Sequence, residues 1–158
     1  MSVFVPLTLA AARELRSSGS ASELVGYADG PALRRWLGET RLDDEEAGYV
    51  ALNHAGAAAL LLDGDSSTRL VLAVDLELVG TDDLGAVSVP QVRWADVRSL
   101  FADEASAADA VRAARQEVGG LDLGAALAVA AVADLQDSYD LLWYAPEELD
   151  SLATDVEG

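Results

Sequence analysis

The sequence predicts a single α+β domain, with an antiparallel or mixed sheet and helices packed on one face. The 158-residue chain is 51% apolar and 24% charged, which is typical of a globular protein with one core. Short β-rich segments and helical segments occur in a mixed order with few strands, which favours α+β. A ferredoxin-like sandwich with extra helices is the preferred architecture, and a parallel doubly wound α/β sheet is the alternative.

The first half of the chain is expected to open with a strand that leads directly into a helix. Residues 2–6 (SVFVP) are β-rich and end at a proline. Thr8 is suited to cap the helix that follows, and Gly19 is suited to end it. A short strand, a short helix and a long helix with four acids in its first turn are then predicted at residues 24–28, 31–37 and 43–62.

The second half begins with the most regular alternation of the chain, at residues 68–78, which predicts a strand. Pro90 lies between two predicted strand pieces and interrupts them. The remaining predicted elements are strand pieces at 86–89 and 96–102, helices at 105–118 and 123–138, a strand at 140–145 and a short acidic helix from 146 to about 153. The domain is therefore expected to span residues 1–153, followed by a flexible acidic tail at 154–158.

The charge excludes some classes of partner. The chain has 28 acidic residues against 10 arginines and no lysine, for a net charge of −18. A folded monomer of this mass exposes roughly 7,500 Å², so such a surface repels nucleic acid and anionic lipid. Neither a signal-peptide pattern nor an apolar stretch long enough to cross a bilayer is present, which predicts a cytoplasmic protein.

Few side chains are suited to catalysis. The chain contains no cysteine and one histidine, His54, so thiol nucleophiles, lysine Schiff bases and multi-histidine metal sites are excluded. No nucleophile elbow and no glycine-rich phosphate loop occurs. We therefore predict no catalytic residue and no cofactor, and favour a non-enzymatic protein.

Two pairs of acids are the candidates for a metal or acid–base site. Asp75 and Glu77 lie two apart on a predicted strand and so share a face, while Asp134 and Asp137 share a helix face. Such carboxylates can bind a hard cation or exchange protons. The simpler interpretation is a solvent-facing surface, with Asp75 and Glu77 paired to an arginine of a neighbouring strand. The segment that starts at Asp63 begins like a calcium loop, but the later positions do not match.

Adjacent aromatic residues near the C-terminus predict an interaction surface. On a strand, Trp143 and Tyr144 must point to opposite faces, so one can fill the core while the other meets solvent or a partner. Glu147 and Glu148 follow directly and add negative charge. Packing of both rings beneath flanking helices is the alternative.

Three segments resemble an uncharacterised family of actinobacterial proteins of about this length. They are VFVPLTLAAARELRSSG near the N-terminus, GYADGPALRRWL after it and SYDLLWYAPEEL near the C-terminus. The resemblance spans most of the chain and implies a domain of unknown function in an actinobacterial cytoplasmic protein. It implies no catalytic residue.

The function expected from these observations is that of a small acidic cytoplasmic module for protein interaction or regulation. Its partner would be a protein, basic in charge, and self-association stays open. The alternatives are a carboxylate-dependent metal-binding protein or hydrolase, and an inhibitor of a basic protein that mimics the charge of DNA.

Overall fold

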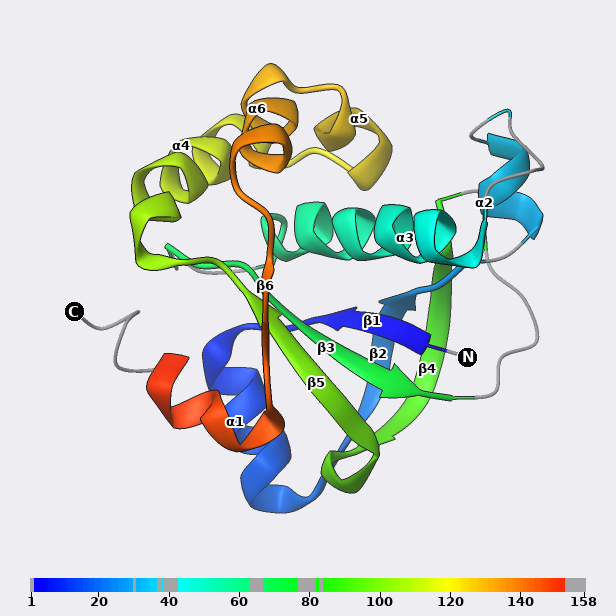
Figure 1. The fold of residues 1–158 in the computed structure, drawn as a ribbon, viewed down its shortest axis with the longest axis vertical. Coiled ribbons are helices and arrows are strands. Elements are labelled where there is room, and N and C mark those ends of the chain that lie inside the picture. The colour runs from blue at the N-terminus through cyan, green and yellow to red at the C-terminus, as the bar shows by residue number, and fades with distance from the viewer. Residues whose placement is uncertain are drawn as a thin grey trace.

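Six strands form one open sheet in the order β4-β2-β1-β3-β5-β6 (Figure 1). The computed structural model describes residues 2–29, 31–36, 38, 43–62, 67–76, 82 and 84–152. The strands are β1 (Ser2–Pro6), β2 (Ser20–Tyr27), β3 (Leu70–Asp75), β4 (Ala86–Arg93), β5 (Val97–Ala102) and β6 (Leu142–Tyr144). The predicted α+β class is confirmed.

All neighbouring strands of this sheet are antiparallel, so the parallel doubly wound alternative is wrong. β1 and β2 flank the first helix and are direct antiparallel neighbours. In a ferredoxin-like sandwich, the two strands that flank the first helix are instead parallel, and another strand lies between them. The fold is thus the related antiparallel form of the prediction.

Local capping residues fix the start of α1 and α3 and the end of α1. They are α1 (Leu9–Ser18), α2 (Pro31–Trp36), α3 (Asp44–Ala59), α4 (Ala108–Val118), α5 (Leu123–Leu127) and α6 (Ala130–Ser138). The Thr8 hydroxyl accepts the Ala11 N–H at 3.1 Å, and Gly19 ends α1 at φ 91°, as expected for these two residues. Asp43 caps α3 by accepting the Glu46 N–H at 2.7 Å.

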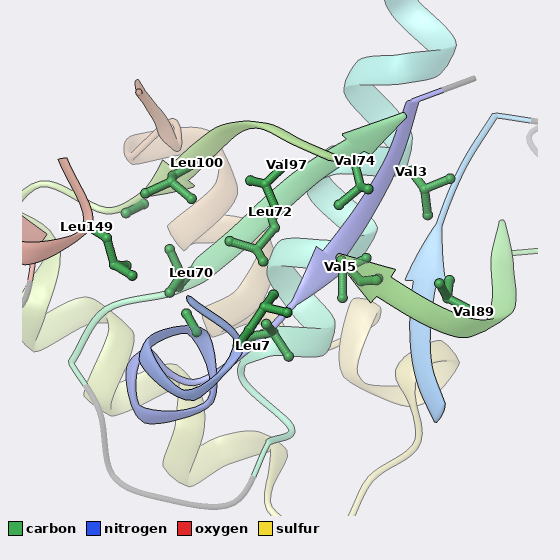
Figure 2. Close-up of a cluster of buried hydrophobic side chains, with 14 of the residues drawn as sticks. Val3, Val5, Leu7, Leu70, Leu72, Val74, Val89, Val97, Leu100 and Leu149 are labelled. Carbon is green, nitrogen blue, oxygen red and sulfur yellow. The ribbon is translucent and has the colours of Figure 1, made fainter. Parts of the chain in front are cut away.

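Helices cover both faces of the sheet, rather than one face as the sequence suggested. On one face, α1 and the helical residues 149–152 enclose a core of aliphatic side chains from five strands (Figure 2). On the other face, α3 packs across β1, β2 and β3. Strand alternation explains the difference, because β1 buries Val3 and Val5 on the first face and turns Phe4 to the second.

A further helical layer of α4, α5 and α6 covers the C-terminal end of α3 (Figure 1). A buried ion pair joins the start of β3 to the end of β5, where the Arg69 guanidinium donates to both carboxylate oxygens of Asp103, at 2.9 and 2.6 Å. Arg69 also donates its backbone N–H to Asp103 and a side-chain N–H to the Tyr139 carbonyl. A buried charge pair with this many hydrogen bonds avoids most of the cost of desolvation.

Several elements differ in extent from the prediction. β4 continues through Pro90, which is tolerated because β4 is an edge strand and the proline needs no ladder partner there. The predicted helix at 123–138 is two helices, and it is less buried than expected because exposed alanines alternate with its core residues. The predicted tail at 154–158 lies outside the described residues. No described helix has the length and apolar character to cross a bilayer.

Candidate functional site

A pocket of about 710 Å³ lies between the first half of α3 and the sheet. Its volume falls in the range that suits small molecules or a few side chains of a partner. Its lining combines aromatic and aliphatic groups with two acids, and consists of Ser2, Phe4, Asp29, Glu45, Gly48, Tyr49, Leu52 and Phe101. No arginine or histidine is among these described lining residues.

The sheet supplies two phenyl rings because of strand alternation. The aliphatic core beneath α1 is called the closed core. Phe4 lies between two valines that point into the closed core, and Phe101 lies between Leu100 and Ala102, which also point into it. The two rings therefore project together on the α3 face, with centroids 6.1 Å apart and planes 75° apart. This is the edge-to-face arrangement that aromatic pairs favour.

The helix supplies a third ring with a fixed hydroxyl. Tyr49 and Leu52 are three residues apart on α3 and so share a face. The Tyr49 hydroxyl donates to the Asp140 carboxylate at 2.9 Å, which connects the pocket to the segment before β6. This hydrogen bond raises the pKa of Tyr49, and a hydrogen bond with Asn53 opposes it. Burial and the negative charges of Asp140 and Asp137 raise the pKa further. Two carboxylates therefore act on the phenol.

The two acids of the lining differ in their partners. Asp29 accepts two hydrogen bonds from Arg34, at 2.9 and 2.7 Å, so its charge is compensated. Glu45 is exposed on the first turn of α3 and forms no ion pair or hydrogen bond with a described residue. The pocket thus keeps one uncompensated negative charge in its lining and two more beside Tyr49.

The predicted aromatic pair lies on β6, at one edge of the sheet (Figure 1). Trp143 is 62% exposed, whereas Tyr144 is half-buried against the closed core. The two side chains thus differ in environment as their adjacent positions on a strand require. Trp143 is paired across the strands with Phe101, so both project on the α3 face. The exposed indole therefore stands next to the pocket.

The acids that follow β6 lie at the surface. Glu147 is exposed, and Glu148 accepts the Ala145 N–H at 2.7 Å, which fixes the turn after the strand. As the last strand of the sheet, β6 has one side without a neighbouring strand among the described residues. The unpaired backbone groups of such an edge are available to another chain.

The candidate metal ligands that the structure describes belong to no cluster of three or more acidic or histidine side chains. Asp75 is exposed and lies 3.5 Å from Arg98 on the neighbouring strand, the pairing considered as the simpler interpretation. Asp134 and Asp137 are exposed on α6. Glu77 and the predicted turn at 63–66 lie outside the described residues. Within the described part of the chain, no group of three or more acidic or histidine side chains could hold a metal ion.

The single histidine is a buried structural group. His54 on α3 places Nδ1 2.8 Å from the Leu84 carbonyl oxygen, and only 5% of the residue is exposed. Burial lowers the pKa of His54, although the hydrogen bond to Leu84 and the charge of Asp82 oppose that effect. The imidazole is not part of the pocket lining.

The pocket is the feature that sequence reasoning missed. Its rings come from positions 4, 49 and 101, and nothing in the linear pattern brings these together. The usable signals were local, namely a phenylalanine at the alternate position of a valine-rich strand and a tyrosine in helical register with Leu52. Neither signal indicates that α3 and the sheet leave a pocket between them.

Comparison with known proteins identifies the family alone. Neither the search of curated proteins nor the search of solved structures gave a match. A family model described as a family of unknown function, DUF6912, matches residues 1–153, which include all three segments on which the sequence resemblance rests. The chain therefore belongs to this family of unknown function.

Proposed function

We propose that the protein is a cytoplasmic interaction module that binds an extended basic segment of a partner protein along β6. The observation that carries the proposal is the exposure of Trp143 directly beside Phe101, which lines the pocket. Exposed tryptophan adjoining a concave apolar surface is typical of the residues that dominate binding energy in interfaces. The partner segment would add to the sheet as a further strand.

The two edges of the sheet are not equivalent. At the β4 edge, Pro90 removes a backbone donor and interrupts the row of groups that another strand could use. β6 contains no proline, and its Leu142 and Trp143 are both exposed. Addition of a strand is therefore favoured at β6.

Charge selects the kind of segment. Asp140 precedes β6, and Glu147 and Glu148 follow it, all exposed. A segment with arginine or lysine between apolar residues would be attracted to this surface, whereas a second copy of the chain would carry the same net charge of −18 and be repelled. The occupant is therefore a different, basic protein.

Selection from a random peptide library displayed on phage tests the proposal. Immobilised wild-type protein should enrich peptides that alternate apolar residues with arginine or lysine. Trp143→Ala should weaken the binding of a synthetic selected peptide at least about tenfold. A tryptophan that becomes buried when a complex forms contributes this much or more to the binding free energy. The dissociation constant is measured by fluorescence anisotropy.

Val25→Ala is the matched control, because Val25 is 51% exposed on β2, away from β6. It should leave the dissociation constant unchanged. Enrichment of acidic peptides, or of none above background, would contradict the proposal. So would equal binding by wild type and a folded Trp143→Ala variant.

The two other functions expected from the sequence have less support. A metal-binding protein or hydrolase needs converging ligands, and the described residues contain no such group. Charge mimicry of DNA needs acids alone and gives no role to an exposed indole. We therefore retain the interaction module as the proposal.

A further inference from the structure

The pocket beside β6 has the chemistry of a site for an organic cation. Phe4, Phe101 and Tyr49 supply three aromatic rings, whose faces carry negative quadrupole potential. A cation placed over such a face is attracted, more strongly where water is excluded. Leu52 and Gly48 add apolar surface that can hold the alkyl chain of the guest.

The charges around the pocket act in the same direction. Glu45 forms no ion pair with any described residue, and Asp140 holds the Tyr49 hydroxyl. Asp137 lies close enough to repel the ionised form of that phenol. A neighbouring cation, Arg34, is already engaged with Asp29 through two hydrogen bonds. A positively charged guest would therefore meet an acid, Glu45, that has no partner in the part of the chain that the structure describes.

Other guests fit less well. An anion would be repelled by Glu45, Asp137 and Asp140. A divalent metal would need several oxygen ligands at short distance, and no described group of three or more acidic or histidine side chains could hold one. A neutral ligand would gain no attraction from the Glu45 carboxylate.

We propose that this pocket receives the guanidinium group of an arginine side chain carried by the segment that binds along β6. This inference rests on the proposed function and adds the side chain that the segment must present. Phe101 lines the pocket and is paired across the strands with Trp143, so the pocket lies next to Trp143. A residue of the partner segment that neighbours the contact with Trp143 can therefore reach the pocket. Guanidinium is preferred over ammonium because it is planar, stacks on rings and is weakly hydrated.

A small probe separates the cation from the peptide that carries it. n-Butylguanidinium, added to the ¹⁵N-labelled protein, should shift the amide resonances of Gly48, Tyr49 and Phe101 with a millimolar dissociation constant. n-Butylammonium should bind more weakly. n-Butylurea has a similar shape without the charge and should cause no saturable shift.

Glu45→Gln tests the charge with little change of shape, and it should weaken the binding of n-butylguanidinium about threefold, as expected for a partly exposed ion pair. Glu117→Gln, on the exposed face of α4, is the matched control and should have no effect. Equal binding of n-butylurea and n-butylguanidinium would overturn the inference. Shifts located away from the pocket, or no saturable shift, would overturn it as well.

The selected peptide distinguishes a failure of this inference from a failure of the proposed function. Replacement of each arginine by citrulline, a neutral isostere, should weaken binding at one position, and Glu45→Gln should remove much of that difference. If Trp143→Ala abolishes peptide binding while citrulline has no effect at any position, the module stands and the arginine pocket does not. If no peptide binds but n-butylguanidinium binds through Glu45, the cation site stands and binding along β6 fails.

Discussion

The two faces of the sheet bury different kinds of side chain. The face beneath α1 is closed by leucine, valine and alanine, with contributions from the helical residues 149–152. It contains no buried charged or polar residue among those described. Its stability comes from the removal of aliphatic surface from water.

The α3 face carries the polar and aromatic groups. The buried polar residues of the described chain project on this side, and they are His54, Arg69, Ser99 and Asp103. The phenyl rings and the pocket lie there as well. One face is thus built for stability alone, while the other combines stability with a pocket. Changes on the two faces should therefore have different consequences.

The largest loss of stability is expected from Asp103→Ala on the α3 face. This change leaves the Arg69 guanidinium buried at 1% exposure, without its carboxylate and with a backbone N–H also unpaired. Breaking a buried pair in this way costs about 3–5 kcal/mol. Urea denaturation followed by circular dichroism measures the free energy of unfolding.

Asp109→Ala is the control for that loss, because Asp109 pairs with Arg112 at the surface of α4. The free energy of unfolding should hardly change. A small effect of Asp103→Ala as well would mean that water or another group satisfies Arg69. The contrast between buried and exposed ion pairs would then be wrong for this protein.

Substitutions at two neighbouring residues of β5 compare the contributions of the two faces to stability. Leu100 is fully buried on the closed face, and Phe101 is half-buried beside the pocket. Leu100→Ala should cost about 2–5 kcal/mol, because it opens a cavity in a dry core. Phe101→Ala should cost less, about 1–2 kcal/mol, because its ring is only partly buried and already borders a pocket.

The effects of these two substitutions on binding should show the opposite order. Phe101→Ala removes a ring of the pocket and the cross-strand neighbour of Trp143, so it should weaken n-butylguanidinium and the selected peptide alike. Leu100→Ala, where folded, should bind both nearly as the wild type does. If Leu100→Ala impairs binding as strongly as Phe101→Ala, the division of roles between the two faces fails.

The elements of the closed face could be predicted from sequence because their determinants are local. Thr8 and Gly19 define α1, and the alternation around Val3 and Val5 identifies β1. The break between α5 and α6 could not be predicted, since residues 123–133 are a nearly continuous apolar run without a helix-ending residue after Gly124.

The candidate site could be predicted only in part. Adjacency on a strand required Trp143 and Tyr144 to differ in environment, and they do. That Trp143 neighbours Phe101 depends on the pairing of β5 with β6, which are about 40 residues apart in the chain. Long-range pairing of this kind is a property of the fold and leaves no mark in the local pattern.

The smallest predicted effect is a pH dependence that belongs to the α3 face alone. Burial lowers the pKa of His54 in the folded protein below the ordinary value of about 6.5. The unfolded chain then binds the proton more readily, so stability rises with pH across this range. The contribution of His54 is complete above about 6.5 and is lost as the pH falls towards the lowered pKa of the folded state.

His54→Asn isolates this contribution, since the asparagine amide nitrogen lies near the position of Nδ1 and can still donate to the Leu84 carbonyl but does not titrate. Urea midpoints measured at a series of pH values should fall more steeply for the wild type than for the variant below about pH 6.5. The carboxylates are the same in both proteins, so their contributions cancel in the difference. Parallel curves would show that the hydrogen bond to Leu84 and the charge of Asp82 fully offset the cost of burying the imidazolium. In that case the α3 face would tolerate a buried cation at His54 as it already does at Arg69.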